Sequence, residues 1–148
     1  MDQSTSKLFT PEEANRMLPL VSVIVRDVRS TFDAYSACKK ELSRQRQEAL
    51  LDVDDPSESA EEVVTGLKQH LDTLTVELRE LVRELTDLGA LMKDPVDGIV
   101  DFPFEHEGEV AYLCWKHGET QVTGWHDVDE GYAERKPLPA TETAPLSR

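Results

Sequence analysis

The sequence has few of the residue types that define several large protein classes. Only two cysteines, Cys38 and Cys114, occur among its 148 residues. This count excludes a disulfide framework and the zinc and redox motifs that are built on paired cysteines. The longest apolar run, Leu18 to Val25, contains a proline and a serine and is far too short to span a membrane. No export signal is visible, so we expect a cytoplasmic protein without a membrane segment.

Basic side chains are also scarce. The chain holds 16 Lys and Arg against 30 Asp and Glu, for a net charge of −14. Nucleic-acid binding requires Lys and Arg at the phosphates, so we expect no nucleic-acid partner. The charge is uneven: residues 1–50 hold 8 basic and 7 acidic side chains, whereas residues 51–97 hold 4 and 13. The local basic cluster (Lys39, Lys40, Arg44 and Arg46) is interpreted as a solvated helix face or as the contact for an acidic helix.

Two long stretches have the apolar spacing of amphipathic helices. Thr10-Pro11-Glu12-Glu13 has the residues of a capping box with proline at the first helical position. Pro19 disfavours helical geometry at the preceding residue, so we predict helices at about 11–17 and 19–51. A third helix is predicted at about 57–88, where leucines alternate at steps of three and four up to a glycine cap at Gly89.

The two long helices are predicted to form an antiparallel, coiled-coil-like hairpin. This arrangement places the basic end of the first helix beside the acidic start of the second. Two helices cannot bury apolar stripes of this length by themselves, because each stripe needs neighbours on more than one side. We therefore expect a homodimer, most simply a four-helix bundle of two hairpins.

From Gly98 the apolar period changes to two. Strands are predicted at about 99–105, 109–116 and 120–126, and Pro103 indicates an edge position for the first of them. The predicted fold class is α+β, with a long helical hairpin followed by a small three-stranded antiparallel β meander. A single domain is expected over residues 8–138, between disordered segments at 1–7 and 139–148.

The C-terminal block, residues 98–138, contains one cluster that could bind a transition metal. Cys114, His117 and His126 supply sulfur and imidazole ligands. Their spacing lacks the two short-spaced pairs of a structural zinc module. The alternative, which we favour, is that Cys114 belongs to the core and the histidines occupy exposed turns. A divalent transition metal is thus the one cofactor to consider.

Enzymatic chemistry has little support in the sequence. His126 and Asp127 could form an acid–base pair, since a carboxylate that orients an imidazole raises its basicity. No nucleophile elbow, phosphate loop or oxyanion-binding motif accompanies them. We therefore favour a protein that is not an enzyme.

The C-terminal block also concentrates aromatic side chains. These residues could build a contact surface for a protein or small-molecule partner. The alternative is that the aromatic rings anchor the sheet onto the helices. The candidate contact residues are Trp115, Trp125, His126, Asp127, Tyr132 and Arg135.

Several segments resemble one known family. They are Lys7-Leu8-Phe9-Thr10, Glu12-Glu13-Ala14-Asn15, Leu18-Pro19-Leu20, Val100-Asp101-Phe102-Pro103, Tyr112-Leu113-Cys114-Trp115-Lys116, Gly118-Glu119, and Trp125-His126-Asp127 through Gly131-Tyr132 and Arg135 to Leu138. The combination resembles the prokaryotic domain of unknown function 2203. The resemblance implies no activity, but it implies that the C-terminal motif is a shared feature and a place to expect a site.

The sequence thus favours a cytoplasmic, acidic, homodimeric binding or assembly module that uses the C-terminal block. The alternative is a metal-binding protein, or a metal-dependent hydrolase, with its site around Cys114, His117 and His126.

Overall fold

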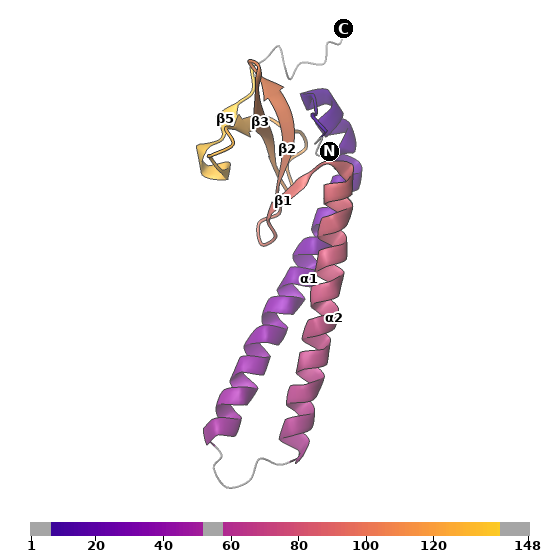
Figure 1. Cartoon of the computed structure of the whole chain (residues 1–148), viewed down its shortest axis with the longest axis vertical. Coiled ribbons are helices and arrows are strands. Elements are labelled where there is room, and N and C mark those ends of the chain that lie inside the picture. Colours follow the sequence, from indigo (N-terminus) through magenta and orange to yellow (C-terminus); the bar gives the residue numbers. More distant parts are fainter. Residues whose placement is uncertain (1–6, 52–57, 140–148) are drawn as a thin grey trace.

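A computed structural model describes residues 7–51 and 58–139 of the chain. Two long helices come first and a small sheet follows, which confirms the α+β class (Figure 1). The sheet has five strands and not the predicted three. In chain order the elements are α1 (Pro11–Leu51), α2 (Glu58–Leu88), β1 (Leu91–Asp94), β2 (Ile99–His106), β3 (Glu109–Lys116), β4 (Gly124–His126), the short 3₁₀ helix η1 (Tyr132–Glu134) and β5 (Lys136–Pro137).

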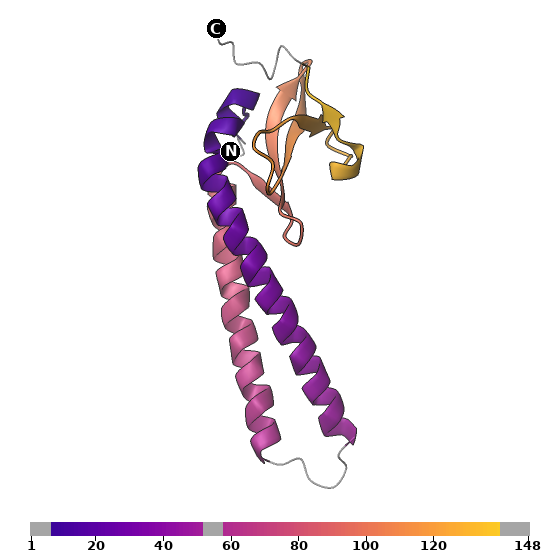
Figure 2. The ribbon, with the colours of Figure 1, turned by 180° about the vertical axis from the view of Figure 1, so that it is seen from behind.

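Helix α1 begins at the predicted capping box. The Thr10 amide donates to Glu13 Oε1 at 2.9 Å, and the Glu13 amide donates to Thr10 Oγ1 at 3.1 Å. The predicted break before Pro19 is wrong, because α1 runs without interruption through that residue. Leu18 and Val21 are buried in the core on either side of it, and their packing outweighs the local preference against helix. Figure 2 shows α1 changing direction near its N-terminal end.

The helices pack side by side and extend well beyond the sheet (Figures 1 and 2). Of the eight apolar heptad positions in α2, only Leu74 and Leu85 are buried. The other six stay partly exposed: Val64, Leu67, Leu71, Leu78, Leu81 and Leu88. The hairpin thus leaves much of its own apolar stripe in contact with water.

The expected charge complementarity within the hairpin is not realised as ion pairs. Arg44 pairs with Glu41 and Glu48 of its own helix. Within residues 7–51 and 58–139, no ion pair joins α1 to α2. Disorder was predicted at 1–7 and 139–148; of these segments, residues 1–6 and 140–148 lie outside the described residues, as do residues 52–57.

The strands form one antiparallel sheet in the order β1-β2-β3-β4-β5. Strands β2 and β3 match the predicted ranges to within one residue. The third predicted strand, 120–126, is shorter, because the Val122 amide donates to the Asn15 side chain at 2.7 Å and not to a neighbouring strand. Sequence periodicity missed β1 and β5, which have only four and two residues.

Strand β2 is not an edge strand, contrary to the inference from Pro103. Strand β1 pairs with β2 only from Ile99 to Asp101. Beyond that point the outer side of β2 meets the N-terminal segment, where the Phe9 amide donates to the Pro103 carbonyl at 2.7 Å. In a strand the N and O atoms of one residue face the same side, so the missing N–H of Pro103 interrupts no ladder bond with β3.

Alternation along the strands gives the sheet two different faces. One face packs on the helices through apolar side chains that include Val100, Phe102, Leu113 and Trp115. The alternate positions point away from the helices, and the C-terminal segment carrying η1 lies on that side (Figure 1). No helix in the described ranges is long and apolar enough to cross a membrane.

Candidate functional site

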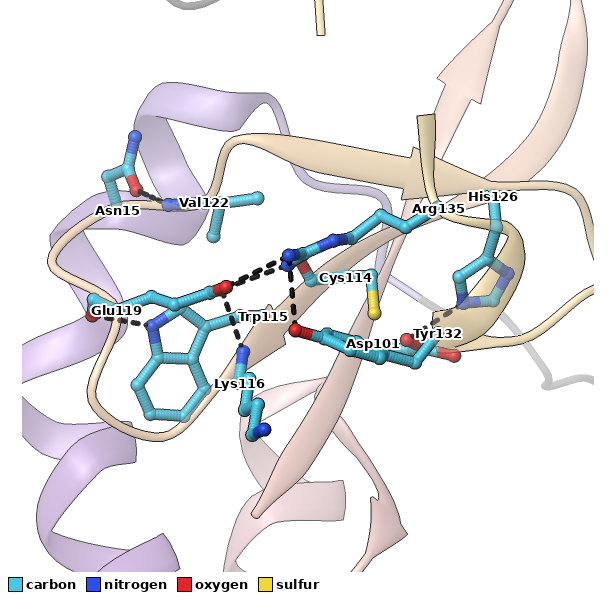
Figure 3. Close-up of polar contacts among 10 residues, drawn as sticks. All are labelled: Asn15, Asp101, Cys114, Trp115, Lys116, Glu119, Val122, His126, Tyr132 and Arg135. Atoms are coloured by element: carbon cyan, nitrogen blue, oxygen red, sulfur yellow. Dashed lines mark hydrogen bonds and ion pairs between the residues drawn. The ribbon is translucent and has the colours of Figure 1, made fainter. Parts of the chain in front are cut away.

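Three side chains that can bind metals meet on the sheet face that points away from the helices. Asp101 of β2 and Cys114 of β3 are paired across the ladder. His126 of β4 pairs with Tyr112 of β3, which lies two residues before Cys114 and therefore on the same face of the sheet. One ligand atom from each residue lies within 4.8 Å of the others. The side chains point toward one another (Figure 3). All three are buried, with exposed fractions of 1%, 0% and 2%.

The hydrogen bonds of His126 fix the orientation of its ring. Nδ1 lies 2.8 Å from the Asp127 carbonyl oxygen, which can only accept, so Nδ1 carries a proton and donates it there. Nε2 lies 3.1 Å from Asp101 Oδ1. The carboxylate that faces the imidazole is therefore Asp101 and not the predicted Asp127, whose side chain accepts from Lys136 Nζ at 3.2 Å.

Burial dominates the electrostatics of this cluster. It raises the pKa of Asp101, and the nearby His126 only partly opposes the rise. Burial, with the Asp101 charge adding to it, also raises the pKa of the Cys114 thiol to about 12. Asp101 Oδ2 is buried without a hydrogen-bond partner. Such an orphaned carboxylate oxygen is unusual in a folded protein and calls for an explanation.

The structure brings together two of the three predicted metal ligands. His117 lies elsewhere: its Nδ1 is 3.2 Å from Arg29 Nη1 on α1. Burial, followed by the charge of Arg29, lowers its pKa. Asp101 takes the third place in the cluster, and the sequence analysis missed it as a ligand. An aspartate between Val100 and Phe102 in an apolar strand was the available signal, because a lone buried acid needs a partner.

Next to the cluster, Arg135 crosses the sheet and holds the C-terminal segment in place (Figure 3). Its guanidinium donates to both carboxylate oxygens of Glu119 at 3.0 Å and stacks 4.4 Å from the centre of the Tyr132 ring. It also donates to the Cys114 carbonyl oxygen at 3.4 Å. Gly124 makes this path possible, since a Cβ there would lie 2.4 Å from Arg135 Cγ and Cδ.

Most of the predicted contact surface is engaged internally. Trp115 is fully buried and donates from Nε1 to the Glu119 carbonyl at 2.9 Å, which supports the anchoring interpretation. Trp125 is half-buried between His106, at 4.0 Å between ring centres, and Lys136 Nζ, at 4.5 Å from its ring. These residues, with the buried His126, leave little apolar surface for a partner.

A separate apolar groove lies where the hairpin meets the sheet. It has a volume of about 480 Å³ and is open to solvent. Both helices contribute to it, together with β1 and the turn after β1. Its lining residues are Phe32, Tyr35, Thr75, Leu78, Arg79, Val82, Met92 and Pro95.

Comparison with known proteins gives a family but no activity. Searches of curated proteins and of solved structures find no significant match to this chain. The family of uncharacterized conserved proteins DUF2203 matches residues 7–138, which confirms the resemblance seen in the sequence, and the chain belongs to that family.

Proposed function

We propose that the protein is a homodimeric assembly module in which the hairpins of two copies pack together as a four-helix bundle. The proposal is supported by the exposure of the apolar stripe of α2. Six of its eight heptad positions remain partly exposed in one copy. Apolar stripes of this kind are buried by further helices in bundle proteins.

The groove at the base of the hairpin is where a second copy would seat. Phe32 and Tyr35 of α1 stack at 5.9 Å between ring centres and form its aromatic wall. Leu78 and Val82 of α2 form the opposite wall. The groove and the partly exposed stripe of α2 share Leu78, so one partner helix can cover both. A two-fold interface buries the same surface on each copy.

The charges of the hairpin fit a second copy of the same chain. Lys40 and Arg46 of α1 form no ion pair in the described part of the chain, and neither do Glu61 and Glu62 of α2. A two-fold pairing in which both hairpins point the same way, with α1 of one copy against α2 of the other, sets these opposite charges in proximity. Such pairs at the rim of an interface contribute more to orientation than to affinity.

A matched pair of valine substitutions tests the proposal. Val82 lines the groove, whereas Val76 is 49% exposed and is not among the residues that line it. Val82→Glu places a charge in the interface and should convert the dimer to a monomer, whereas Val76→Glu should leave it dimeric. Light scattering coupled to size exclusion measures the mass, and far-ultraviolet circular dichroism checks that both variants remain helical.

The wild-type dimer should have about twice the chain mass of 16.7 kDa. Equal masses for the two folded variants would contradict the assignment of the groove as the interface. A wild-type mass of one chain at tens of micromolar would contradict the dimer itself.

A further inference from the structure

We propose that Asp101, Cys114 and His126 bind one divalent transition-metal ion, zinc by preference, as a structural site beneath the C-terminal segment. The site involves none of the residues that line the groove, so it is independent of the proposed assembly. It differs from the sequence-derived candidate in having Asp101 in place of His117.

Two acceptor atoms meet in this cluster. His126 donates from Nδ1 to a backbone carbonyl, so in the neutral form of the ring Nε2 has only a lone pair to offer. This lone pair faces the carboxylate oxygen Oδ1 of Asp101 at 3.1 Å. A proton or a metal ion must lie between two such atoms. A backbone carbonyl that orients the second ring nitrogen is also the usual surrounding of a metal-bound histidine.

Asp101, a member of this cluster, also has a buried carboxylate oxygen, Oδ2, that lacks a hydrogen-bond partner. A shared proton would satisfy Oδ1 and Nε2, but it would leave only a contact with the Cys114 thiol for the rest of the carboxylate, and Oδ2 has no hydrogen bond of normal geometry. A metal ion satisfies more of the cluster, since it can take one or both carboxylate oxygens together with the sulfur and the nitrogen. Either Oδ2 or a bound water then supplies the fourth position of a tetrahedral site.

The spacing of the histidine and aspartate atoms and the charges of the ligands fit zinc. Two ligand atoms about 2.0 Å from a tetrahedral ion lie roughly 3.3 Å from each other. The 3.1 Å between His126 Nε2 and Asp101 Oδ1 is close to that spacing. Thiolate and carboxylate together carry the two negative charges that balance a divalent cation. Arg135 nearby is already neutralised by Glu119 and does not compete for these charges.

The burial of the ligands decides between a structural and a hydrolytic metal. No ligand is more than 2% exposed, so a substrate has no access to the ion. Binding releases the Cys114 thiol proton to solvent and couples to folding, because the site is closed in the folded chain. The ion would connect β2, β3 and β4 on the face that lacks helices.

Refolding with and without metal tests the site. The untagged chain is refolded from denaturant with zinc chloride or with a chelator, desalted, and analysed for bound zinc by mass spectrometry. We expect about one equivalent of zinc per chain and an unfolding midpoint raised by about 5–10 °C. Cys114→Ser and Asp101→Asn should each reduce bound zinc more than tenfold. Cys38→Ser and His117→Gln are the matched controls and should retain it.

Refolding the wild-type chain with cobalt gives a second readout. Coordination by Cys114 produces a thiolate-to-cobalt charge-transfer band in the near ultraviolet, which Cys38→Ser keeps. Less than about a tenth of an equivalent of zinc in the wild-type chain, or the absence of the cobalt band, would overturn the proposal. Equal zinc loss in His117→Gln and Cys114→Ser would also overturn it. The mass of the same samples reports dimerisation separately.

Discussion

At the scale of single residues, Gly124 and Arg135 decide how the C-terminal segment rests on the sheet. Arg135 reaches Glu119 only by passing directly over Gly124. The ion pair is partly buried, with 21% and 28% of the two side chains exposed, and its bidentate geometry is the favourable one for arginine. The absence of one side chain thus positions the segment that covers the buried cluster.

We predict that Gly124→Ala destabilises the protein by about 1–3 kcal/mol, because the new methyl group must displace Arg135 from its partners. Gly66→Ala is the control: Gly66 lies in α2, and a Cβ added there would meet no neighbouring atom within 4 Å. That change should stabilise the helix by up to about 1 kcal/mol. Urea unfolding measures both, and a neutral Gly124→Ala would show that Arg135 can move at little cost.

The thiol of Cys114 should be unreactive in the metal-free folded chain. With its pKa raised to about 12 by burial, about one thiol in 10⁴ is ionised at pH 8. In a Cys38→Ser background, we expect alkylation at pH 8 to be at least about 10³-fold slower than in the urea-unfolded chain. Labelling at the unfolded rate would contradict the buried position of Cys114.

Sequence reasoning at this scale found Cys114 and His126 but not their partner. Their residue types are informative wherever they occur, whereas the role of Asp101 depends on the register of β2 against β3. That register depends on the whole sheet and is not a local property. His117 was grouped with Cys114 because the two are close in sequence, but the turn after β3 directs it toward Arg29 of α1.

At the scale of elements, the link between α1 and the β3–β4 loop joins the two halves of the fold. The amide of Val122, a fully buried residue, donates to Asn15 Oδ1. We predict that Asn15→Leu costs about 1–3 kcal/mol, because it leaves a buried donor unpaired. Asn15→Asp keeps an acceptor oxygen and should cost less. If thermal unfolding shows that Asn15→Leu and Asn15→Asp lose the same amount of stability, water replaces the Asn15 side chain as the acceptor for the Val122 amide.

The elements differ in how well the sequence predicts them. Capping residues, leucine spacing and strand alternation are local signals, and they located α2, β2 and β3 within one or two residues. The helix break predicted at Pro19 is wrong because the burial of Leu18 and Val21 stabilises the helix through that residue. The short strands β1 and β5 carry too few residues for a period, and only their neighbours in the sheet define them.

At the scale of the whole molecule, the hairpin and the sheet are placed so that the sheet covers only one end of the helices (Figure 1). At about 1.5 Å per residue, the 41 residues of α1 extend roughly 60 Å. From the sequence, we predicted only that the apolar stripes are too long for two helices to bury by themselves. The groove was not predictable, because its residues come from α1, α2 and the segment around β1.

In the proposed dimer, a second copy of the chain covers the partly exposed stripe of α2 and the adjoining groove. Sedimentation equilibrium of the unmodified protein between about 1 and 100 μM tests it most directly, since stable interfaces of standard size persist in this range. We predict a mass of about two chains of 16.7 kDa across the range. A mass of one chain up to the highest concentration would contradict the claim.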